Sequence, residues 1–175
     1  MVSIKAAFPL ILVVLGAVAA VPTPNPELDI DYVNALIPGE DLPSPKELGL
    51  TNEDLMKPIP NGISKRGYIF EGRYECKYAA VCTTADSRAC FNYLFELGQK
   101  NCRVTGKPTE LCRIRRCRWI GQAEVVPVIS SSYRDIAYSG NTVTNRCELG
   151  GLVGGFNYPS ENSPFRVTVV GDWNV

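Results

Sequence analysis

The sequence has 175 residues, of which 45% are hydrophobic and 21% charged, and its 18 basic and 18 acidic side chains give no formal net charge. This composition excludes a wholly disordered chain and a multi-pass membrane protein. Histidine is absent, which excludes Ser-His-Asp and Cys-His nucleophile systems, histidine-based ribonuclease chemistry and zinc sites that need an imidazole.

Residues 1–20 have the pattern of a secretory signal peptide, with one positive charge at Lys5 and then an apolar run that ends in small residues. A membrane anchor is the alternative, but Ala6–Val21 contains only 16 residues and is interrupted by Pro9, whereas a helix needs roughly 20 residues to span a bilayer. We therefore expect cleavage after Ala20, no transmembrane anchor and a secreted, extracellular product.

The segment Val21–Arg66 differs in composition from residues 67–175. It holds eight of the thirteen prolines, no cysteine, and eight acidic against four basic side chains, which is typical of a poorly ordered acidic propeptide. It ends at Lys65-Arg66, which resembles a kexin-type processing site and would bring a kexin-type protease as a maturation partner. A chance dibasic pair is the alternative, as Arg115-Arg116 illustrates, but Lys65-Arg66 lies at the composition boundary.

A further cut after Arg116 would leave two disulfide-linked chains. The remaining domain, residues 67–175, carries thirteen basic and ten acidic side chains and is therefore basic, whereas the propeptide is acidic. One hypothesis is that the propeptide neutralises a basic surface, with Leu28–Ile37 and Lys46–Met56 docking as amphipathic helices. Such docking would assist folding or confer latency.

All seven cysteines lie in residues 67–175, and their number predicts a disulfide framework in a small secreted domain. A metal cluster is disfavoured because the chain has no Cys-x-x-Cys pair and no histidine. Three bridges leave one thiol, which is either buried and free or linked to a partner. The spacing leaves the pairing open among Cys76, Cys82, Cys90, Cys102, Cys112, Cys117 and Cys147.

The elements of this domain are predicted from periodicity and from turn residues. Tyr68–Val81 predicts a long strand or a bent pair. Residues 83–98 predict a helix with Thr84 or Asp86 as its N-cap and Gly98 as its stop. Two strands are then expected, at Asn101–Thr105 and Leu111–Ile120, with a turn between them.

A β-branched run, Ala123–Ile129, precedes a second helix that Ser130–Ser132 would cap and that Gly140 would weaken. In the final strand, the side chains of Phe165, Val167, Val169 and Trp173 alternate with polar ones. The order predicts an α+β sandwich, with two helices on one face of an antiparallel sheet in a split β-α-β arrangement.

The segment Cys112–Trp119 alternates arginine with apolar and cysteine side chains. A bulge at Arg115-Arg116 would turn the apolar and cysteine side chains to one side and the arginines to the other. This predicts a binding stripe beside an aromatic side chain, formed by Arg113, Arg115, Arg116, Arg118 and Trp119. Its partner would be an anionic lipid surface, a sulfated or phosphorylated polymer or an acidic host protein. The alternative is a solvated edge strand whose charges prevent aggregation.

Other ligands are not indicated. The domain has only a small excess of positive charge and no recognised nucleic-acid motif. The glycines of Cys147–Tyr158 lack the Lys-Ser/Thr of a phosphate loop and fit a turn after a helix. The sequence therefore predicts no nucleic-acid partner, no cofactor, no metal and no catalytic residue, although a pair of carboxylates for glycoside hydrolysis remains an alternative.

The precursor plan resembles that of fungal small secreted effectors and of the killer toxins of smut fungi, which have α/β-sandwich folds. The segments DIAYSGNTVTNRCELGGLVGGFNY (135–158) and FRVTVV (165–170) are similar to the helix, cysteine, glycine-pair and strand endings of such proteins. The resemblance implies a non-enzymatic effector that binds a host-plant component and promotes infection or triggers a host response. An antifungal toxin that acts at the membrane is the second expectation, and a small carbohydrate-active hydrolase is the third.

Overall fold

The computed structural model describes residues 30–59, 73–159 and 163–172, so the signal peptide and Lys65-Arg66 lie outside the described residues. A six-stranded sheet has the order β1-β5-β6-β10-β9-β2, and every neighbouring pair in it is antiparallel. Its strands are β1 (Leu36–Pro38), β5 (Thr109–Ile114), β6 (Cys117–Ala123), β10 (Phe165–Gly171), β9 (Gly155–Asn157) and β2 (Tyr74–Cys76).

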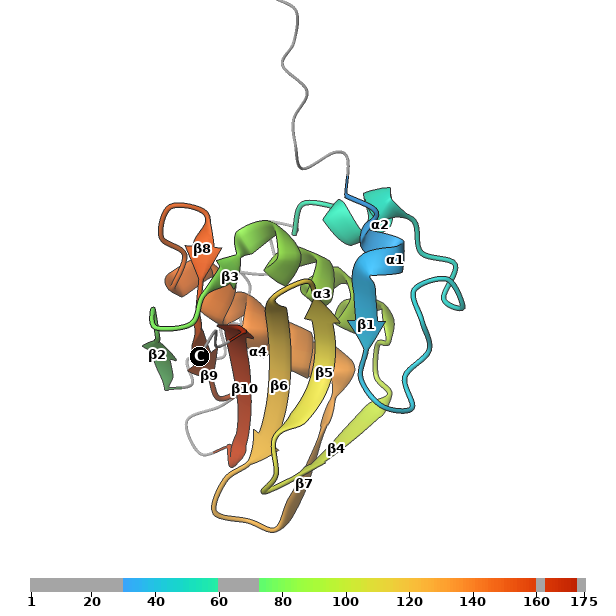
Figure 1. Ribbon diagram of the computed structural model, residues 1–175. Coiled ribbons are helices and arrows are strands. Elements are labelled where there is room, and N and C mark those ends of the chain that lie inside the picture. Colours follow the sequence, from blue (N-terminus) through green and yellow to red (C-terminus); the bar gives the residue numbers. More distant parts are fainter. Residues whose placement is uncertain (1–29, 60–72, 160–162, 173–175) are drawn as a thin grey trace, which may run out of the picture.

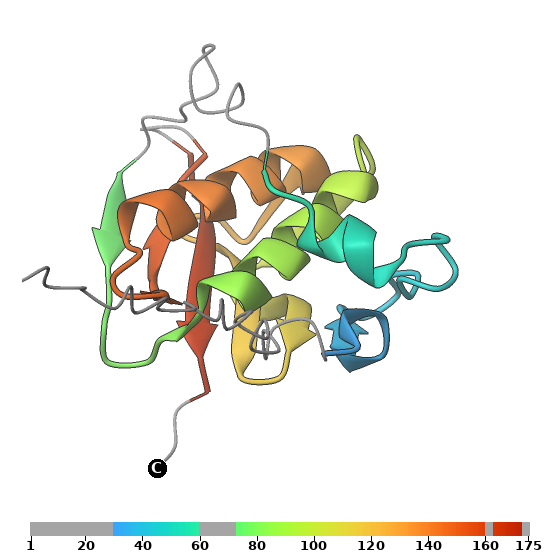
Figure 2. The same cartoon turned by 90° about the horizontal axis from the view of Figure 1, so that it is seen from above.

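Two long helices, α3 (Thr84–Glu96) and α4 (Tyr133–Arg146), cover one face of this sheet (Figures 1 and 2). Two further strand pairs join β3 (Cys82–Thr83) to β8 (Leu152–Val153) and β4 (Asn101–Thr105) to β7 (Val128–Ser132). The predicted α+β class, with two helices on one face of an antiparallel sheet, is confirmed. Within the described ranges, no helix is both long enough and apolar enough to cross a bilayer.

The two long helices begin at hydroxyl N-caps, and α3 is followed by a glycine. The hydroxyl of Thr83 caps α3 by accepting from the backbone N–H of Asp86 at 3.1 Å, so the N-cap lies one residue before the earliest predicted position. Gly98 ends this segment with φ of 65°, a conformation that favours glycine. Ser132, within the predicted Ser130–Ser132 cap, accepts from the N–H of Asp135 at 3.1 Å and begins α4.

Two strand predictions were wrong. Leu111–Ile120 is not one strand, because the chain reverses between Ile114 and Cys117 and forms the β5–β6 hairpin. Arg115 has φ of 50° in the two-residue turn, where a bulge had been expected. Of the long strand or bent pair predicted at Tyr68–Val81, only Tyr74–Cys76 is a strand in the part that the structure describes.

The hairpin still places Cys112, Ile114, Cys117 and Trp119 on the core side, where all four are fully buried. Trp119 fits because α4 presents Gly140 to it: a Cβ on Gly140 would lie 2.1 Å from the indole ring. The indole Nε1 donates to Ser87 Oγ at 3.2 Å. In β10 the predicted alternation is confirmed for Phe165, Val167 and Val169, while Trp173 lies outside the described residues.

Three disulfides hold the domain together, and all of them start or end near the helices. They pair Cys76 with Cys147, Cys82 with Cys117, and Cys90 with Cys112. The seventh cysteine, Cys102, is free and buried. The predicted disulfide framework is therefore confirmed. Of the two alternatives for the seventh cysteine, the structure shows the buried, free thiol.

Part of the predicted propeptide is folded. Residues 30–59, here called the leader segment, contain α1 (Tyr32–Ala35), β1 and α2 (Asn52–Met56) and lie along β5 and α3 (Figure 1). The interpretation of Val21–Arg66 as poorly ordered is wrong for these residues, because their apolar side chains enter the common core.

Candidate functional site

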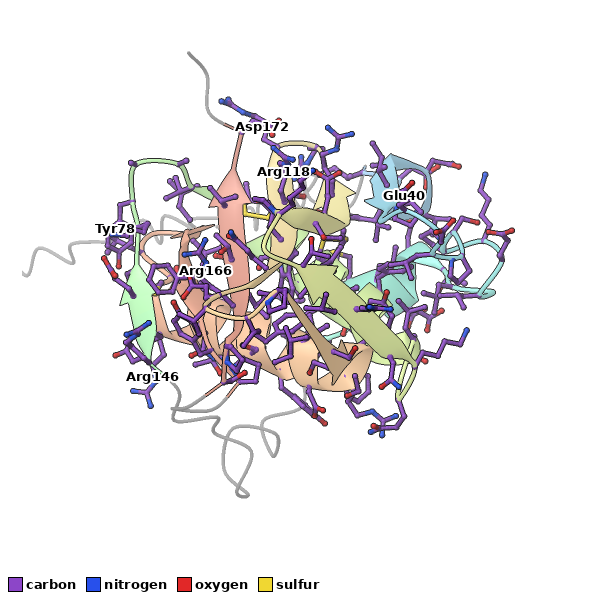
Figure 3. All side chains as sticks on the ribbon, turned by 90° about the horizontal axis from the view of Figure 1, so that it is seen from below. Glu40, Tyr78, Arg118, Arg146, Arg166 and Asp172 are labelled. Atoms are coloured by element: carbon purple, nitrogen blue, oxygen red, sulfur yellow. A yellow bond between two sulfur atoms is a disulfide. The ribbon has the colours of Figure 1, made fainter. Side chains whose placement is uncertain are left out.

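A cleft of about 550 Å³ lies where the β5–β6 turn meets the loop before α3. Residues 79–83 and Leu152 form its walls, and four charged residues line it: Asp86, Arg115, Arg116 and Asp172. The two arginines come from the hairpin turn and Asp86 from the first turn of α3. Asp172 directly follows the last residue of β10 (Figure 3). The cleft thus gathers charges from three elements.

An ion pair closes one side of this cleft. The guanidinium of Arg115 donates from Nε to both oxygens of Asp86 at 3.1 Å and from Nη2 to Oδ1 at 2.5 Å. The side chain of Asp86 is only 4% exposed, whereas that of Arg115 is 42% exposed. Because the carboxylate is already paired and hydrogen-bonded, we assign this pair to anchoring the hairpin turn on α3.

Arg116 is also exposed, but unlike Arg115 it forms no ion pair with Asp86. Among the described residues no acidic side chain lies within 4 Å of its guanidinium. Its backbone carbonyl accepts from the N–H of Asp172 at 2.8 Å, which fixes the turn against the end of β10. The cleft therefore offers a positioned cation without an acidic partner in the described part of the chain.

The other two arginines of the predicted stripe lie on the sheet and share one partner. Glu110 accepts from Arg118 Nε at 2.6 Å and lies 3.3 Å from Arg113 Nε. Trp119 is fully buried and does not face solvent beside the arginines. The predicted stripe is thus divided in two, with Arg113 and Arg118 at Glu110 and with Arg115 and Arg116 at the cleft.

The sheet face opposite the helices carries a second charged cluster that the sequence analysis missed. Arg166 pairs with Glu124 at 2.6 Å and donates to Gln122 Oε1 at 2.6 Å, and Tyr158 Oη donates to Glu124 Oε2 at 2.5 Å. The guanidinium of Arg166 also lies 5.5 Å from the ring centroid of Phe156. Alternation along β10 would have placed Arg166 outward, but its partners come from strands distant in sequence. Arg166 and Glu124 are thus paired with each other, although Arg166 Nε is buried without a hydrogen-bond partner among the described residues.

Cys102 is no candidate nucleophile. Burial raises the pKa of its thiol, and a hydrogen bond with Tyr133 lowers the pKa by less. A raised pKa keeps the group as a thiol at neutral pH, whereas the thiolate is the reactive form. Throughout residues 30–59, 73–159 and 163–172, no group of three or more Cys, Asp or Glu side chains could hold a metal ion.

One comparison with known proteins gives a match. A family model described as "Domain of unknown function (DUF8794)" matches residues 71–171, more than half of the chain. No curated protein and no solved structure gives a significant match. The match includes Asp86, Arg115 and Arg116 of the cleft, and it excludes the leader segment.

Proposed function

Because this chain belongs to the DUF8794 family, whose description assigns no activity, we propose its function from its own residues: it is a secreted, non-enzymatic effector that binds an acidic component of a host plant. The observation that carries the proposal is Arg116, an exposed guanidinium in a cleft with no acidic partner among the described residues. Such a group gains most from a carboxylate, sulfate or phosphate brought by a partner. The three disulfides suit an oxidising, extracellular setting.

The proposal includes maturation by cleavage after Arg66. The family match begins at residue 71, shortly after Lys65-Arg66, which supports a domain boundary there. The mass of the protein secreted by a kexin-competent fungal host tests this step. A domain that starts at Gly67, and a longer product when Lys65 and Arg66 are both changed to Ala, are the expected results. A secreted protein that stays uncut would contradict the step.

Binding is tested by applying the purified, oxidised secreted protein to leaves of several plant genotypes and to growing fungal cells, with dye entry scored in both. A leaf response restricted to some genotypes is expected. It should be lost in Arg116→Ala and kept in Arg113→Ala, because Arg113 already lies near Glu110 at 3.3 Å. Equal loss in both variants would contradict binding through the cleft.

The same assay tests the second candidate function, a toxin that acts at the membrane of fungal cells. Dye entry into fungal cells that disappears when Arg113, Arg115, Arg116 and Arg118 are all changed to Ala would establish a membrane-directed toxin instead. We rank it second because three of these arginines have acidic partners in the structure, and paired charges attract an anionic surface less strongly.

A hydrolase stays as the third candidate because Asp86 and Asp172 line the same cleft. Hydrolysis needs one carboxyl group that donates a proton and another that acts as base or nucleophile. Both oxygens of Asp86 accept hydrogen bonds from Arg115, which favours an anchoring role. We expect Asp172→Asn to keep the leaf response; loss of activity on an oligosaccharide substrate in that variant would favour the enzyme.

A further inference from the structure

The leader segment completes the main sheet. Its strand β1 pairs antiparallel with β5, with Leu36 opposite Ile114 and Pro38 opposite Cys112. The N–H of Gly39 then donates to the carbonyl of Leu111 at 3.1 Å. A Cβ on Gly39 would lie 2.5 Å from the carbonyl oxygen of Glu110, so the close approach requires glycine. Without the leader segment, β5 would be an exposed sheet edge.

The contact is mainly apolar. Tyr32, Leu36 and Leu55 are 1%, 5% and 0% exposed, and they belong to the same core cluster as the buried residues of α3 and β5. Within the described ranges no ion pair joins the leader segment to the rest of the chain. Burial of apolar surface, rather than the charge neutralisation hypothesised from the sequence, therefore accounts for the docking.

Two side chains of α3 hold the leader backbone. Tyr93 is fully buried, and its hydroxyl donates to the carbonyl of Pro43 at 2.7 Å. Asn92 Nδ2 donates to the carbonyls of Leu55 at 2.7 Å and Lys57 at 3.0 Å. Departure of the leader segment would remove this acceptor, and the Tyr93 hydroxyl would have to bond to water in its place.

The leader segment also has internal order (Figure 2). Thr51 and Asp54 form a reciprocal capping box at the start of α2. The N–H of Val33 donates to Asn52 Oδ1 at 2.9 Å and so joins the α1 region to α2. A peptide that is partly ordered on its own loses less conformational entropy when it binds.

From these contacts we infer that, after the cleavage proposed above, the leader segment stays bound as a separate, non-covalent chain in the groove formed by the β5 edge and α3. The secreted protein would then be a two-chain complex, and the groove would be a peptide-binding surface whose ligand is this segment. The inference rests on the proposed function in one respect: a two-chain complex forms only if the chain is cut after Arg66. The groove itself is a property of the uncut chain.

The test starts from the full secreted chain, purified uncut from a host that lacks the kexin-type protease. The protease is then added, and denaturing mass spectrometry verifies the cut. Size-exclusion chromatography and native mass spectrometry show whether the two products travel together. If the protease leaves the chain intact, the processing step fails, and an unrelated protease site placed within residues 61–66 still allows the groove to be tested.

Two neighbouring leader residues give a matched pair of variants. Leu36 is 5% exposed and Ile37 is 46% exposed in the same strand. Leu36→Ala should weaken the association by at least about thirtyfold and Ile37→Ala by less than about threefold, because only the first removes fully buried apolar surface. Gly39→Ala should also release the leader, through its clash with the backbone of β5.

Co-migration of the two chains, little changed between about 0.05 and 0.5 M salt because the contact among the described residues is apolar and without ion pairs, is the expected result. Separation of the unsubstituted chains after cleavage would overturn the inference, and so would equal effects of Leu36→Ala and Ile37→Ala. If Leu36→Ala prevents folding of the uncut chain, co-migration or separation of the two unsubstituted chains after cleavage decides whether the inference holds.

Discussion

At the scale of single residues, Gly140 shows how packing can reverse a helix propensity. Glycine in the middle of a helix costs about 1 kcal/mol relative to alanine, and from sequence alone Gly140 weakens its helix. In the structure the indole of Trp119 occupies the space that a Cβ at position 140 would need. The glycine therefore lets the indole of Trp119 pack directly against α4, which no local sequence pattern indicates.

Gly140→Ala should lower the free energy of unfolding by about 2 kcal/mol or more, although helix propensity alone predicts a gain. Chemical denaturation measures the change. Gly106→Ala is the matched control, because its Cβ would meet only Ala123 O at 3.9 Å, and it should be close to neutral. A Gly140→Ala variant as stable as the unsubstituted protein would show that Trp119 can move aside.

The arginines of the hairpin should contribute unequally to stability. Arg115→Ala leaves the buried carboxylate of Asp86 without its partner and should cost about 2 kcal/mol, discounted for the half-exposed guanidinium. Arg113→Ala, which removes a more exposed pair, should cost less than about 1 kcal/mol. Urea unfolding of both variants checks this order, and similar losses would argue against the anchoring role of Asp86.

Cys102 should resist alkylation in the folded protein. Burial raises the pKa of its thiol, which lowers the fraction of reactive thiolate, and it also shields the sulfur from the reagent. At pH 8, iodoacetamide should label almost no thiol in the folded protein. After the protein is unfolded without a reductant, which leaves the three disulfides intact, it should label one thiol per chain. Rapid labelling of the native protein would mean that Cys102 is accessible.

At the scale of elements, local signals predicted helices better than strands. Helix caps depend on side-chain chemistry within a few residues, so the sequence placed the start of α3 at Thr84 or Asp86, close to the observed Thr83, and that of α4 within Ser130–Ser132. The hairpin at Arg115-Arg116 lacks glycine and asparagine, so the usual turn signal was missing. The pairing of β4 with β7 rather than with β5 depends on distant contacts that no local pattern encodes.

The disulfide between Cys76 and Cys147 should matter most for β2. It ties this three-residue strand to the end of α4 across 71 residues of sequence. Replacing both cysteines by Ala should cost about 2–4 kcal/mol in unfolding free energy. Cys102→Ala, which removes a buried thiol but no crosslink, should cost less. A double variant no less stable than Cys102→Ala would contradict a stabilising role for the bridge.

At the scale of the whole molecule, the sequence predicted the α+β class, the disulfide framework and the two helices on one face. It predicted an arginine stripe but not the acidic partners of three of these arginines, which are Glu110 for Arg113 and Arg118 and Asp86 for Arg115. It favoured a poorly ordered leader, since eight prolines and an excess of acid are typical of disorder. The two amphipathic runs that it singled out there, Leu28–Ile37 and Lys46–Met56, contain the helices α1 and α2. The leader is nevertheless ordered, because a few of its apolar side chains are buried in a core that residues of α3 and β5 also form.

Hydrogen exchange on the uncut chain tests most directly whether the leader segment is part of this core. Peptides that cover β1 and Gly39 should exchange as slowly as those that cover β5 and should become labelled together with them, because the two segments open as one cooperative unit. Exchange of the leader amides at the rate of an unfolded peptide, while β5 stays protected, would contradict a shared core.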